Sequence, residues 1–307
     1  MLRSTRLKPL LTYRAYSTKA VELSFDKHAI RPSQDSPLLI CHGLFGSKKN
    51  WSSLAKAFSS RLSRDVYTII IKKDLRNHGD SPHSEEHTYE AMTTDLVEFI
   101  SKHNLKAPIL LGHSMGGKAV MATALQHPEM VSKLVVVDMP PVAMTLSRNF
   151  ATYVDAMREI EAANVSKQSE ADKILAKYES NIGIRMFLLT NLRRSDNNVF
   201  QFRVPYEILG RSLPSIGAFD IPSHLSYPKP TLFIAGGKSP YRIPFEEQSE
   251  WVNQLFPQSR LEVVEQAGHW GKGIEDISVN MTDSEVNVVH AEKPDIVLTS
   301  VTQFINN

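Results

Sequence analysis

Short apolar runs alternate with stretches of helical spacing along most of the chain, and this alternation limits the folds open to it. The apolar runs are rich in Val, Ile and Leu, as at 37–43, 65–74, 133–141 and 229–237. Continuous apolar strands between helices predict a mostly parallel central sheet with helices on both faces, which is an α/β fold. In such a sheet, residues with chemical roles gather at the carboxyl ends of the strands.

Helical stretches fill most of the intervals between the predicted strands. They are expected at 50–62, 88–103, 118–126, 245–256 and 294–305. One interval is much longer than the others: residues 142–226 are mostly helical and polar and contain no strong strand. We interpret 142–226 as a helical cap insertion within one α/β domain that spans residues 17–307.

The first 16 residues differ in composition from the rest of the chain. They carry Arg3, Arg6, Lys8 and Arg14 and no acidic residue. The segment is rich in hydroxyl groups and lacks the apolar centre of a secretory signal, which is typical of a mitochondrial transit peptide. Arg14 stands three residues before Ser17, as at a processing site that is cleaved after Tyr16. We therefore expect residues 1–16 to be a transit peptide and the protein to be mitochondrial.

The bulk composition excludes several classes of partner. The formal net charge is only +2, which gives no case for nucleic-acid binding. No apolar run approaches the roughly 20 residues that a membrane-spanning helix needs. The single cysteine, Cys41, excludes an intramolecular disulfide, and its apolar surroundings predict a buried side chain.

Residues 112–118, GHSMGGK, fit two different chemistries. As G-x-S-x-G they form a nucleophile elbow, which presents Ser114 for acyl transfer. As G-x-x-x-x-G-K they resemble a phosphate-binding loop with Lys118 on a nucleotide. The phosphate-loop motif requires Ser or Thr after the lysine, where this chain has Ala119. We therefore favour the elbow.

Acyl transfer through a serine needs a base, a carboxylate that orients the base, and two backbone amides for the oxyanion. Asp138 closes the strand at 133–141, and the loop after the strand at 229–237 has no acidic residue before Glu246. Asp138 is therefore the expected acid. His269 follows the last strand and is the expected base, in the chain order serine, acid, histidine.

The oxyanion donors are expected from two short segments. The N–H of Leu44 follows the strand at 37–43, and the N–H of Met115 comes directly after the nucleophile. We interpret His42, which precedes this loop, as structural rather than catalytic. His290 is the alternative base.

A metal site is a further possibility in the segment 77–87. His78, His83 and His87 lie there at irregular spacing, in a stretch rich in turn residues. Zinc sites use a few regular ligand spacings. We therefore interpret the segment as a solvated or substrate-flanking loop.

Six motifs together resemble a known family. They are HGLFGSKKNW (42–51), DLRNHGDSPHS (74–84), GHSMGGKA (112–119), VVVDMPPV (135–142), FIAGGKSPY (233–241) and AGHW (267–270). The set is similar to the mitochondrial α/β-hydrolase-domain family, which includes bacterial esterases and the fungal ethanol acetyltransferases. The resemblance implies an α/β-hydrolase fold with a helical cap, a Ser114–Asp138–His269 triad and mitochondrial residence.

The same resemblance implies an activity. It points to a serine acyl hydrolase that acts on small-molecule acyl esters or thioesters, with no metal and no prosthetic group. One alternative is an alcohol O-acetyltransferase that makes acetate esters, with acetyl-CoA as the acyl donor. Another alternative is a non-catalytic partner protein with a hydrolase fold.

One departure from the family separates AGHW from VHAEKP, which are contiguous in relatives. Residues 271–288 form an acidic, polar insert beside His269. We hypothesise that the insert is translated intron sequence, because Gly271-Lys272 can be encoded GGTAAG, which contains a splice-donor-like GTAAG. Sequencing the transcript tests this, and a uniform mature message that retains the insert would contradict it.

Overall fold

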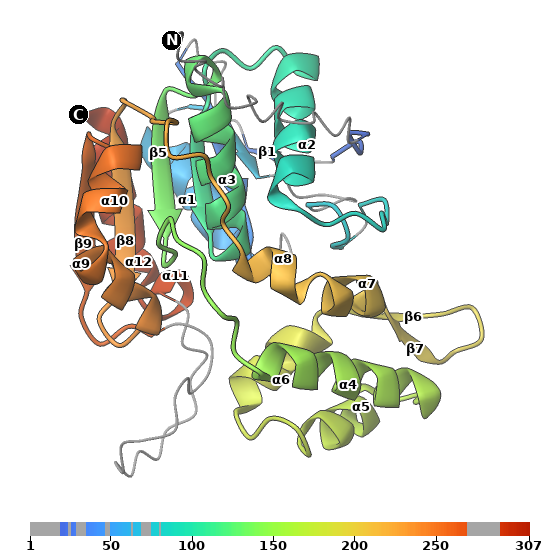
Figure 1. Ribbon diagram of the computed structural model, residues 1–307. Coiled ribbons are helices and arrows are strands. Elements are labelled where there is room, and N and C mark those ends of the chain that lie inside the picture. Colours follow the sequence, from blue (N-terminus) through green and yellow to red (C-terminus); the bar gives the residue numbers. More distant parts are fainter. Residues whose placement is uncertain are drawn as a thin grey trace, which may run out of the picture.

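Seven strands of the described chain form one twisted sheet in the order β1-β3-β2-β4-β5-β8-β9 (Figure 1). The computed structural model describes residues 19–23, 26–28, 35–46, 50–62, 64–68, 75–79, 81–268 and 289–307. The strands are β1 (Asp26–His28), β2 (Leu38–Cys41), β3 (Val66–Thr68), β4 (Ile109–His113), β5 (Lys133–Val137), β8 (Thr231–Gly236) and β9 (Ser259–Val264). Neighbours pair in parallel, except that β1 runs antiparallel to β3.

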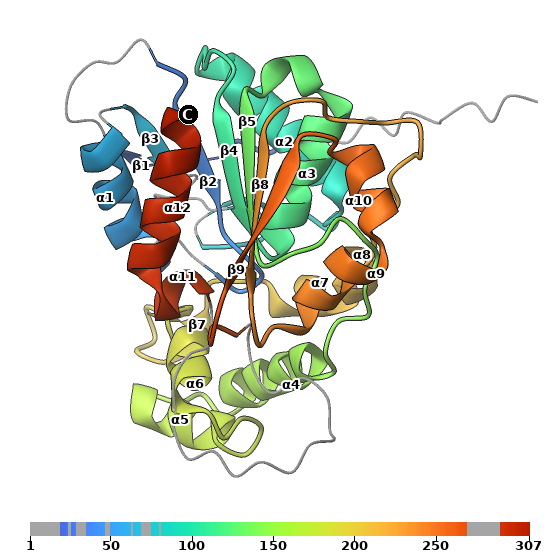
Figure 2. The same cartoon turned by 90° about the vertical axis from the view of Figure 1, so that its left-hand side faces the viewer.

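Helices cover both faces of the sheet (Figure 2). One face carries α1 (Ser52–Leu62) and α12 (Pro294–Asn306), and the other carries α2 (Tyr89–Lys102), α3 (Met115–Gln126) and α10 (Ser249–Leu255). Strand β2 shows why two layers are needed. Leu38 and Ile40 belong to the core on the α1 face, and Leu39 and Cys41 to the core on the α3 face. Successive side chains of a strand point to opposite faces, so a strand without polar residues must be covered on both. The predicted fold class is confirmed.

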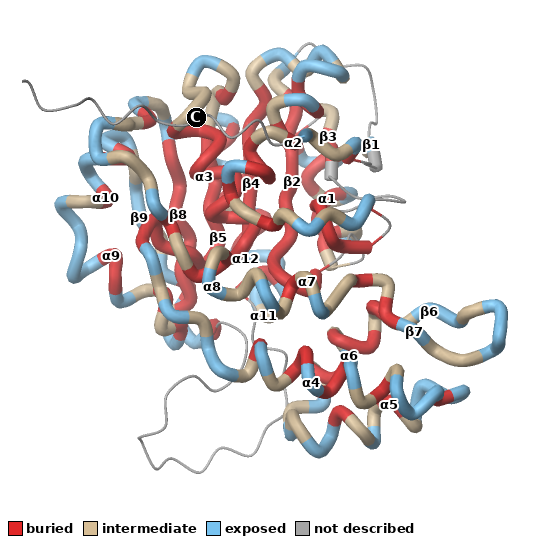
Figure 3. Tube along the Cα trace, turned by 45° about the vertical axis from the view of Figure 1, so that its right-hand side comes forward, coloured by how far each residue is buried: buried red, intermediate tan, exposed pale blue. Residues whose placement is uncertain are grey.

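The strand register brings several carboxyl ends to one edge of the sheet. Cys41 pairs with Gly112, His113 with Val137, and Val137 with Ile234. The residues that follow β2, β4, β5 and β8 therefore meet at this edge. The buried positions, red in Figure 3, run through these strands to the same edge.

The chain between β5 and β8 forms a mostly helical layer beyond this edge (Figure 1). Its elements are α4 (Asn149–Ala162), α5 (Gln168–Leu175), α6 (Ile182–Leu189), β6 (Leu192–Arg194), β7 (Phe200–Phe202), α7 (Tyr206–Arg211) and α8 (Leu213–Gly217). Strands β6 and β7 form an antiparallel hairpin. We refer to residues 142–226 as the cap.

Two local predictions need correction. The sequence VELSF (21–25) predicts a first strand, but its residues 21–23 lie outside a strand, where Val21 N–H donates to Oδ1 of Asp95 at 2.7 Å. The helix expected at 245–256 is two helices, α9 (Ile243–Glu247) and α10, because the backbone leaves the helical conformation at Gln248. The short helix α11 (Val289–Glu292) precedes α12.

Candidate active site

Ser114 lies at the sharp turn between β4 and α3. Its backbone has φ 52° and ψ −120°, a conformation that residues other than glycine rarely adopt. The glycines on either side allow the turn to close. A Cβ on Gly112 would lie 2.2 Å from the carbonyl oxygen of Gly116, and a Cβ on Gly116 would lie 2.4 Å from that of His42. The expected elbow geometry is therefore present around Ser114.

The turn after β2 lies directly beside the nucleophile. Gly46 N–H donates to the Gly43 carbonyl at 2.9 Å, which closes the turn 43–46. A Cβ on Gly43 would lie 3.2 Å from Cβ of Ser114. Within the described residues, the backbone amides of Leu44 and Met115 donate to no protein acceptor. Both amides can therefore donate to a substrate oxygen beside Ser114, as an oxyanion hole requires.

Asp138 lies at the end of β5 and is completely buried. Its Oδ1 accepts from Gly236 N–H at 2.9 Å, and its Oδ2 accepts from Ser239 Oγ at 2.8 Å. Ser114 N–H donates to the carbonyl of Val137, the preceding residue, at 3.2 Å. The carboxylate is therefore fixed between β5 and β8, on a strand directly paired with that of the nucleophile.

Nine described residues other than glycine have a positive φ, and three of them belong to the segments that form the candidate site. Phe45 has φ 54°, Ser114 52° and Asp138 53°, and each follows a different strand of the sheet. Such conformations cost on the order of 1–3 kcal/mol each and persist where the surroundings enforce them, often at functional sites. Their coincidence at one edge of the sheet supports a functional site there.

His269, the expected base, lies outside the described residues, as do the predicted transit peptide at 1–16 and the insert at 271–288. The described residues on either side of the 269–288 segment lie against the acid's support. A Cβ on Gly236, which binds Asp138, would lie 2.7 Å from the carbonyl oxygen of Ala267 and 3.1 Å from Cγ2 of Val289. The described residues on both sides of 269–288 therefore lie close to Gly236, whose amide binds Asp138.

His290, the alternative base, is buried among aromatic rings. Its ring stacks on Trp51 with centroids 4.1 Å apart and meets the edge of the His113 ring at 4.6 Å. This contact joins α11 to the start of α1. The packing gives His290 a structural role in the core.

The segment 77–87, interpreted as a solvated or substrate-flanking loop, is only partly exposed to solvent. His78 and His87 are buried, while His83 lies near the surface with Nε2 at 3.0 Å from the Arg203 carbonyl. Burial lowers the pKa of His78 well below its ordinary value, and burial lowers that of His87 to about 3. Both imidazoles are therefore neutral near pH 7. Among the described residues, no group of three metal-ligating side chains occurs.

His42 and His78 link neighbouring loops. Nε2 of His42 accepts from Leu75 N–H at 3.3 Å, and Nε2 of His78 accepts from Phe45 N–H at 3.0 Å. Nδ1 of His78 lies 3.1 Å from the Arg76 carbonyl, which fixes the tautomer with the proton on Nδ1. The pair ties the turn 43–46 to the loop after β3, in line with a structural role for His42.

Lys118 holds the cap instead of pointing to a nucleotide site. Its Nζ donates to the carbonyls of Gly217 at 2.7 Å and Ala218 at 3.2 Å and lies 5.9 Å from the ring centres of Tyr89 and Phe219. Burial lowers its pKa to about 7. A cavity of about 560 Å³ is lined by residues of the cap, among them Met144, Leu146, Arg148, Leu213 and Gly217.

A buried ion pair supports the loop after β3, and sequence reasoning missed it. Arg76 Nε and Nη2 donate to the two carboxylate oxygens of Asp95 on α2 at 2.7 and 2.8 Å, and both side chains are fully buried. Arg76 also donates to the carbonyls of Glu86 and Ala91. The only signal in the sequence was a charged residue on the apolar side of a predicted helix.

No helix in the described part of the chain is long and apolar enough to cross a membrane. Cys41 is fully buried in β2, as expected. Burial raises the pKa of its thiol.

Comparison with known proteins places this geometry in a family. The family model described as "alpha/beta hydrolase fold" matches residues 36–275. The mouse protein named sn-1-specific diacylglycerol lipase ABHD11 is 39% identical over 272 residues, which cover 87% of this chain and 80% of the relative. A Saccharomyces cerevisiae protein named probable alcohol acetyltransferase is 33% identical over 310 residues, covering 93% and 83%.

A solved structure titled marine microorganism esterase is also similar. Its TM-score is 0.78 at 29% sequence identity, and the match covers 93% of this chain and all of that one. The family match, these relatives and the shared architecture lead to one conclusion: the chain belongs to the alpha/beta hydrolase fold family.

Proposed function

We propose that the chain is a serine acyl hydrolase, an esterase or thioesterase acting on small acyl esters or thioesters. The observation that carries this is the strained turn of Ser114, which lies beside the amides of Leu44 and Met115, neither of which has an acceptor among the described residues. A hydroxyl next to two backbone donors is the arrangement that acyl transfer requires. The names of the mouse and marine relatives, a lipase and an esterase, support ester bonds as the target.

The proposed mechanism uses the triad Ser114, Asp138 and His269. His269 takes the proton of Ser114 Oγ as the oxygen attacks the substrate carbonyl. The Leu44 and Met115 amides stabilise the oxyanion, and the protonated histidine returns the proton to the leaving group. Water, deprotonated by the same histidine, then releases the acid and restores Ser114. Asp138, fixed by Gly236 and Ser239, orients the imidazole and stabilises its charged form.

We further propose that this chemistry uses no cofactor and takes place in mitochondria. Each step is a proton transfer or an attack at a carbonyl, so the side chains and backbone amides suffice. The mitochondrial setting rests on the Arg-rich, acid-free leader at residues 1–16. Import of the chain into isolated mitochondria with shortening after Tyr16 is expected, and an unprocessed chain outside them would contradict it.

Alcohol acetyl transfer is the second candidate, favoured by the yeast relative named probable alcohol acetyltransferase. Both candidates share the acyl-Ser114 intermediate and differ in what attacks it. An alcohol would yield an acetate ester where water would yield acetate. Exclusion of water from the site decides the partition.

Product analysis with acetyl-CoA and ethanol tests both candidates at once. We expect acetate to be the main product, and none from Ser114→Ala. Ethyl acetate as the main product would favour the transferase. A folded chain that yields neither product, and that hydrolyses no p-nitrophenyl ester, would favour the third possibility, a non-catalytic partner protein.

A further inference from the structure

The turn that carries Leu44 needs outside support. It is a four-residue turn, Gly43 to Gly46, with Phe45 in its third position at φ 54°. Turns with a positive φ at this position usually place Gly or Asn there. Phenylalanine, like other residues with a bulky side chain, disfavours this backbone conformation, so its surroundings must enforce it.

Two buried side chains hold the peptide groups on either side of Phe45. Nε2 of His78, in the loop after β3, accepts from Phe45 N–H at 3.0 Å. Nδ2 of Asn191, in the cap, donates to the Phe45 carbonyl at 2.9 Å. His78 is 0% exposed and Asn191 1%, so water does not replace either bond. The turn 43–46 is therefore held both by the loop after β3, through His78, and by the cap, through Asn191.

Asn191 is itself fixed within the cap. Its N–H donates to the Leu188 carbonyl at the end of α6 at 3.1 Å, and its carbonyl accepts from Arg203 N–H at 2.8 Å. The cap also meets the turn through Phe150 of α4, whose ring centre lies 6.3 Å from that of Phe45. A displacement of the cap from the sheet edge would therefore release the Phe45 carbonyl.

We propose that Asn191 and His78 are positioning residues, which fix the Leu44 amide by holding the peptide groups on either side of Phe45. The position of the cap against the sheet therefore determines the geometry of the oxyanion hole. We call each of these two hydrogen bonds to Phe45 a clamp. The proposal rests on the proposed function, because it assigns the Leu44 amide to the oxyanion. The Leu44 N–H lies one residue before the clamped one, in the same closed turn. Removing either clamp lets the turn relax and turns that amide away from the position of the developing charge.

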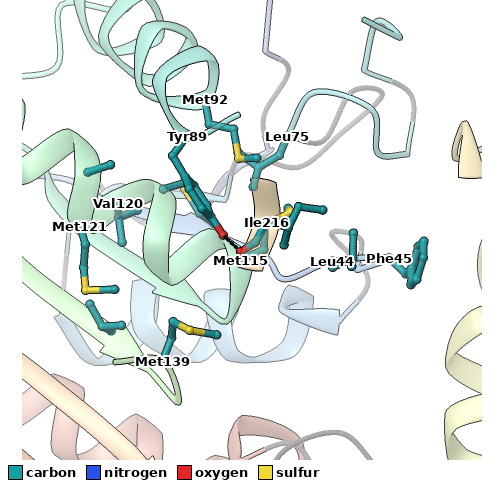
Figure 4. Packing of buried hydrophobic residues seen from close by; sticks show 14 of the residues in the cluster. Leu44, Phe45, Leu75, Tyr89, Met92, Met115, Val120, Met121, Met139 and Ile216 are labelled. Carbon is teal, nitrogen blue, oxygen red and sulfur yellow. Dashed lines mark hydrogen bonds between the residues drawn. The ribbon is translucent and has the colours of Figure 1, made fainter. Parts of the chain in front are cut away.

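The test compares Asn191→Leu with Tyr89→Phe in the full chain. The hydroxyl of Tyr89 on α2 donates to the Ile216 carbonyl of the cap at 2.6 Å, shown dashed in Figure 4. Tyr89→Phe therefore also removes a buried bond from the α/β core to the cap, but not one to the turn. Circular dichroism checks the fold of each variant.

Two readouts separate positioning from general loosening: kcat and KM for p-nitrophenyl acetate, and the affinity for a trifluoromethyl ketone, whose serine adduct carries the oxyanion. We expect Asn191→Leu to lower kcat and ketone affinity by about tenfold or more, with KM and all values for Tyr89→Phe within about twofold of the unaltered chain. Equal losses in both variants, or no loss in Asn191→Leu, would overturn the proposal.

A second pair decides the matter if Asn191→Leu does not fold. His78→Gln keeps an acceptor oxygen for the Phe45 N–H, whereas His78→Leu does not. We expect Gln to retain much more kcat and ketone affinity than Leu; equal values would overturn the proposal. An unaltered chain that neither turns over ester nor binds the ketone contradicts the proposed function itself. An active chain with equally active variants contradicts only the clamp.

Discussion

The hydroxyl of Ser239 donates a hydrogen bond of 2.8 Å to Oδ2 of Asp138, and both side chains are buried. Ser239 follows β8, the strand after which sequence reasoning found no acid. The acid instead stands at the end of β5 and takes its support from β8, through Ser239 and the Gly236 amide. Residues at the ends of both strands therefore position the Asp138 carboxylate.

Ser239→Ala is expected to lower kcat about tenfold, because a hydrogen bond to a buried charged group contributes roughly 1.5–3 kcal/mol. The carboxylate would lose the hydrogen bond from Ser239 and hold the base less firmly. Steady-state kinetics with p-nitrophenyl acetate measure the effect, and Ser239→Thr, which keeps the hydroxyl, serves as the control. Unchanged kcat in Ser239→Ala would show that the Ser239 hydroxyl is not needed to fix the acid.

Gly116→Ala is expected to destabilise the protein by more than about 2 kcal/mol, because its Cβ would collide with backbone. The nearest atoms, at 2.4 and 2.5 Å, are the carbonyl oxygens of His42 and Cys41 in the adjoining strand and turn. Gly117→Ala is the matched control, since its Cβ would meet side-chain atoms at 3.1 and 3.2 Å. Urea unfolding compares the two; equal losses would argue against a tight elbow.

The buried histidines predict acid sensitivity below pH 6.5. Burial lowers the pKa of His87 to about 3, so between pH 6.5 and 3 the unfolded chain binds a proton that the folded chain does not. The contribution of His87 to the free energy of unfolding is therefore fully present above pH 6.5 and is lost as the pH falls toward 3. His78, with its lowered pKa, contributes in the same direction.

His87→Gln is expected to reduce this loss of stability at acid pH. The free energy of unfolding in urea at pH 7, 5.5 and 4.5 measures the slope for the variant and the unaltered chain. The variant loses less stability between pH 7 and 4.5, since glutamine does not titrate. Identical slopes would mean that other groups cause the acid sensitivity.

Arg76→Ala is expected to cost about 3–5 kcal/mol, because it leaves the Asp95 carboxylate buried and unpaired. Arg211→Ala is the control, since its pair with Glu85 lies at the surface, with side chains 62% and 81% exposed. That change is expected to cost less than about 1 kcal/mol. Thermal and urea unfolding of both variants decide; a loss for Arg76→Ala as small as the control's would contradict the argument.

Much of the fold was predictable because it depends on local pattern. The apolar strands and the glycines of GHSMGGK fix the sheet, the elbow and the edge at which the chemistry gathers. The placement of Asp138 followed from its position at a strand end. These inferences depend only on residues that are close together in the sequence.

The support of the site was not predictable, because it depends on contacts distant in sequence. Asn191 meets Phe45 across 146 residues, and Ser239 meets Asp138 across 101. The burial of His78 was missed for the same reason, since turn residues indicate a surface loop and do not reveal its contacts with His42 and Phe45. The position of His269 stays a prediction from the AGHW motif.

The central claim is that Ser114 is an activated nucleophile, and labelling of the purified chain with a fluorophosphonate tests it most directly. The account predicts stoichiometric labelling that is lost in Ser114→Ala, with the fold of that variant unchanged by circular dichroism. Labelling that persists in Ser114→Ala, or a folded chain that does not react, would contradict it.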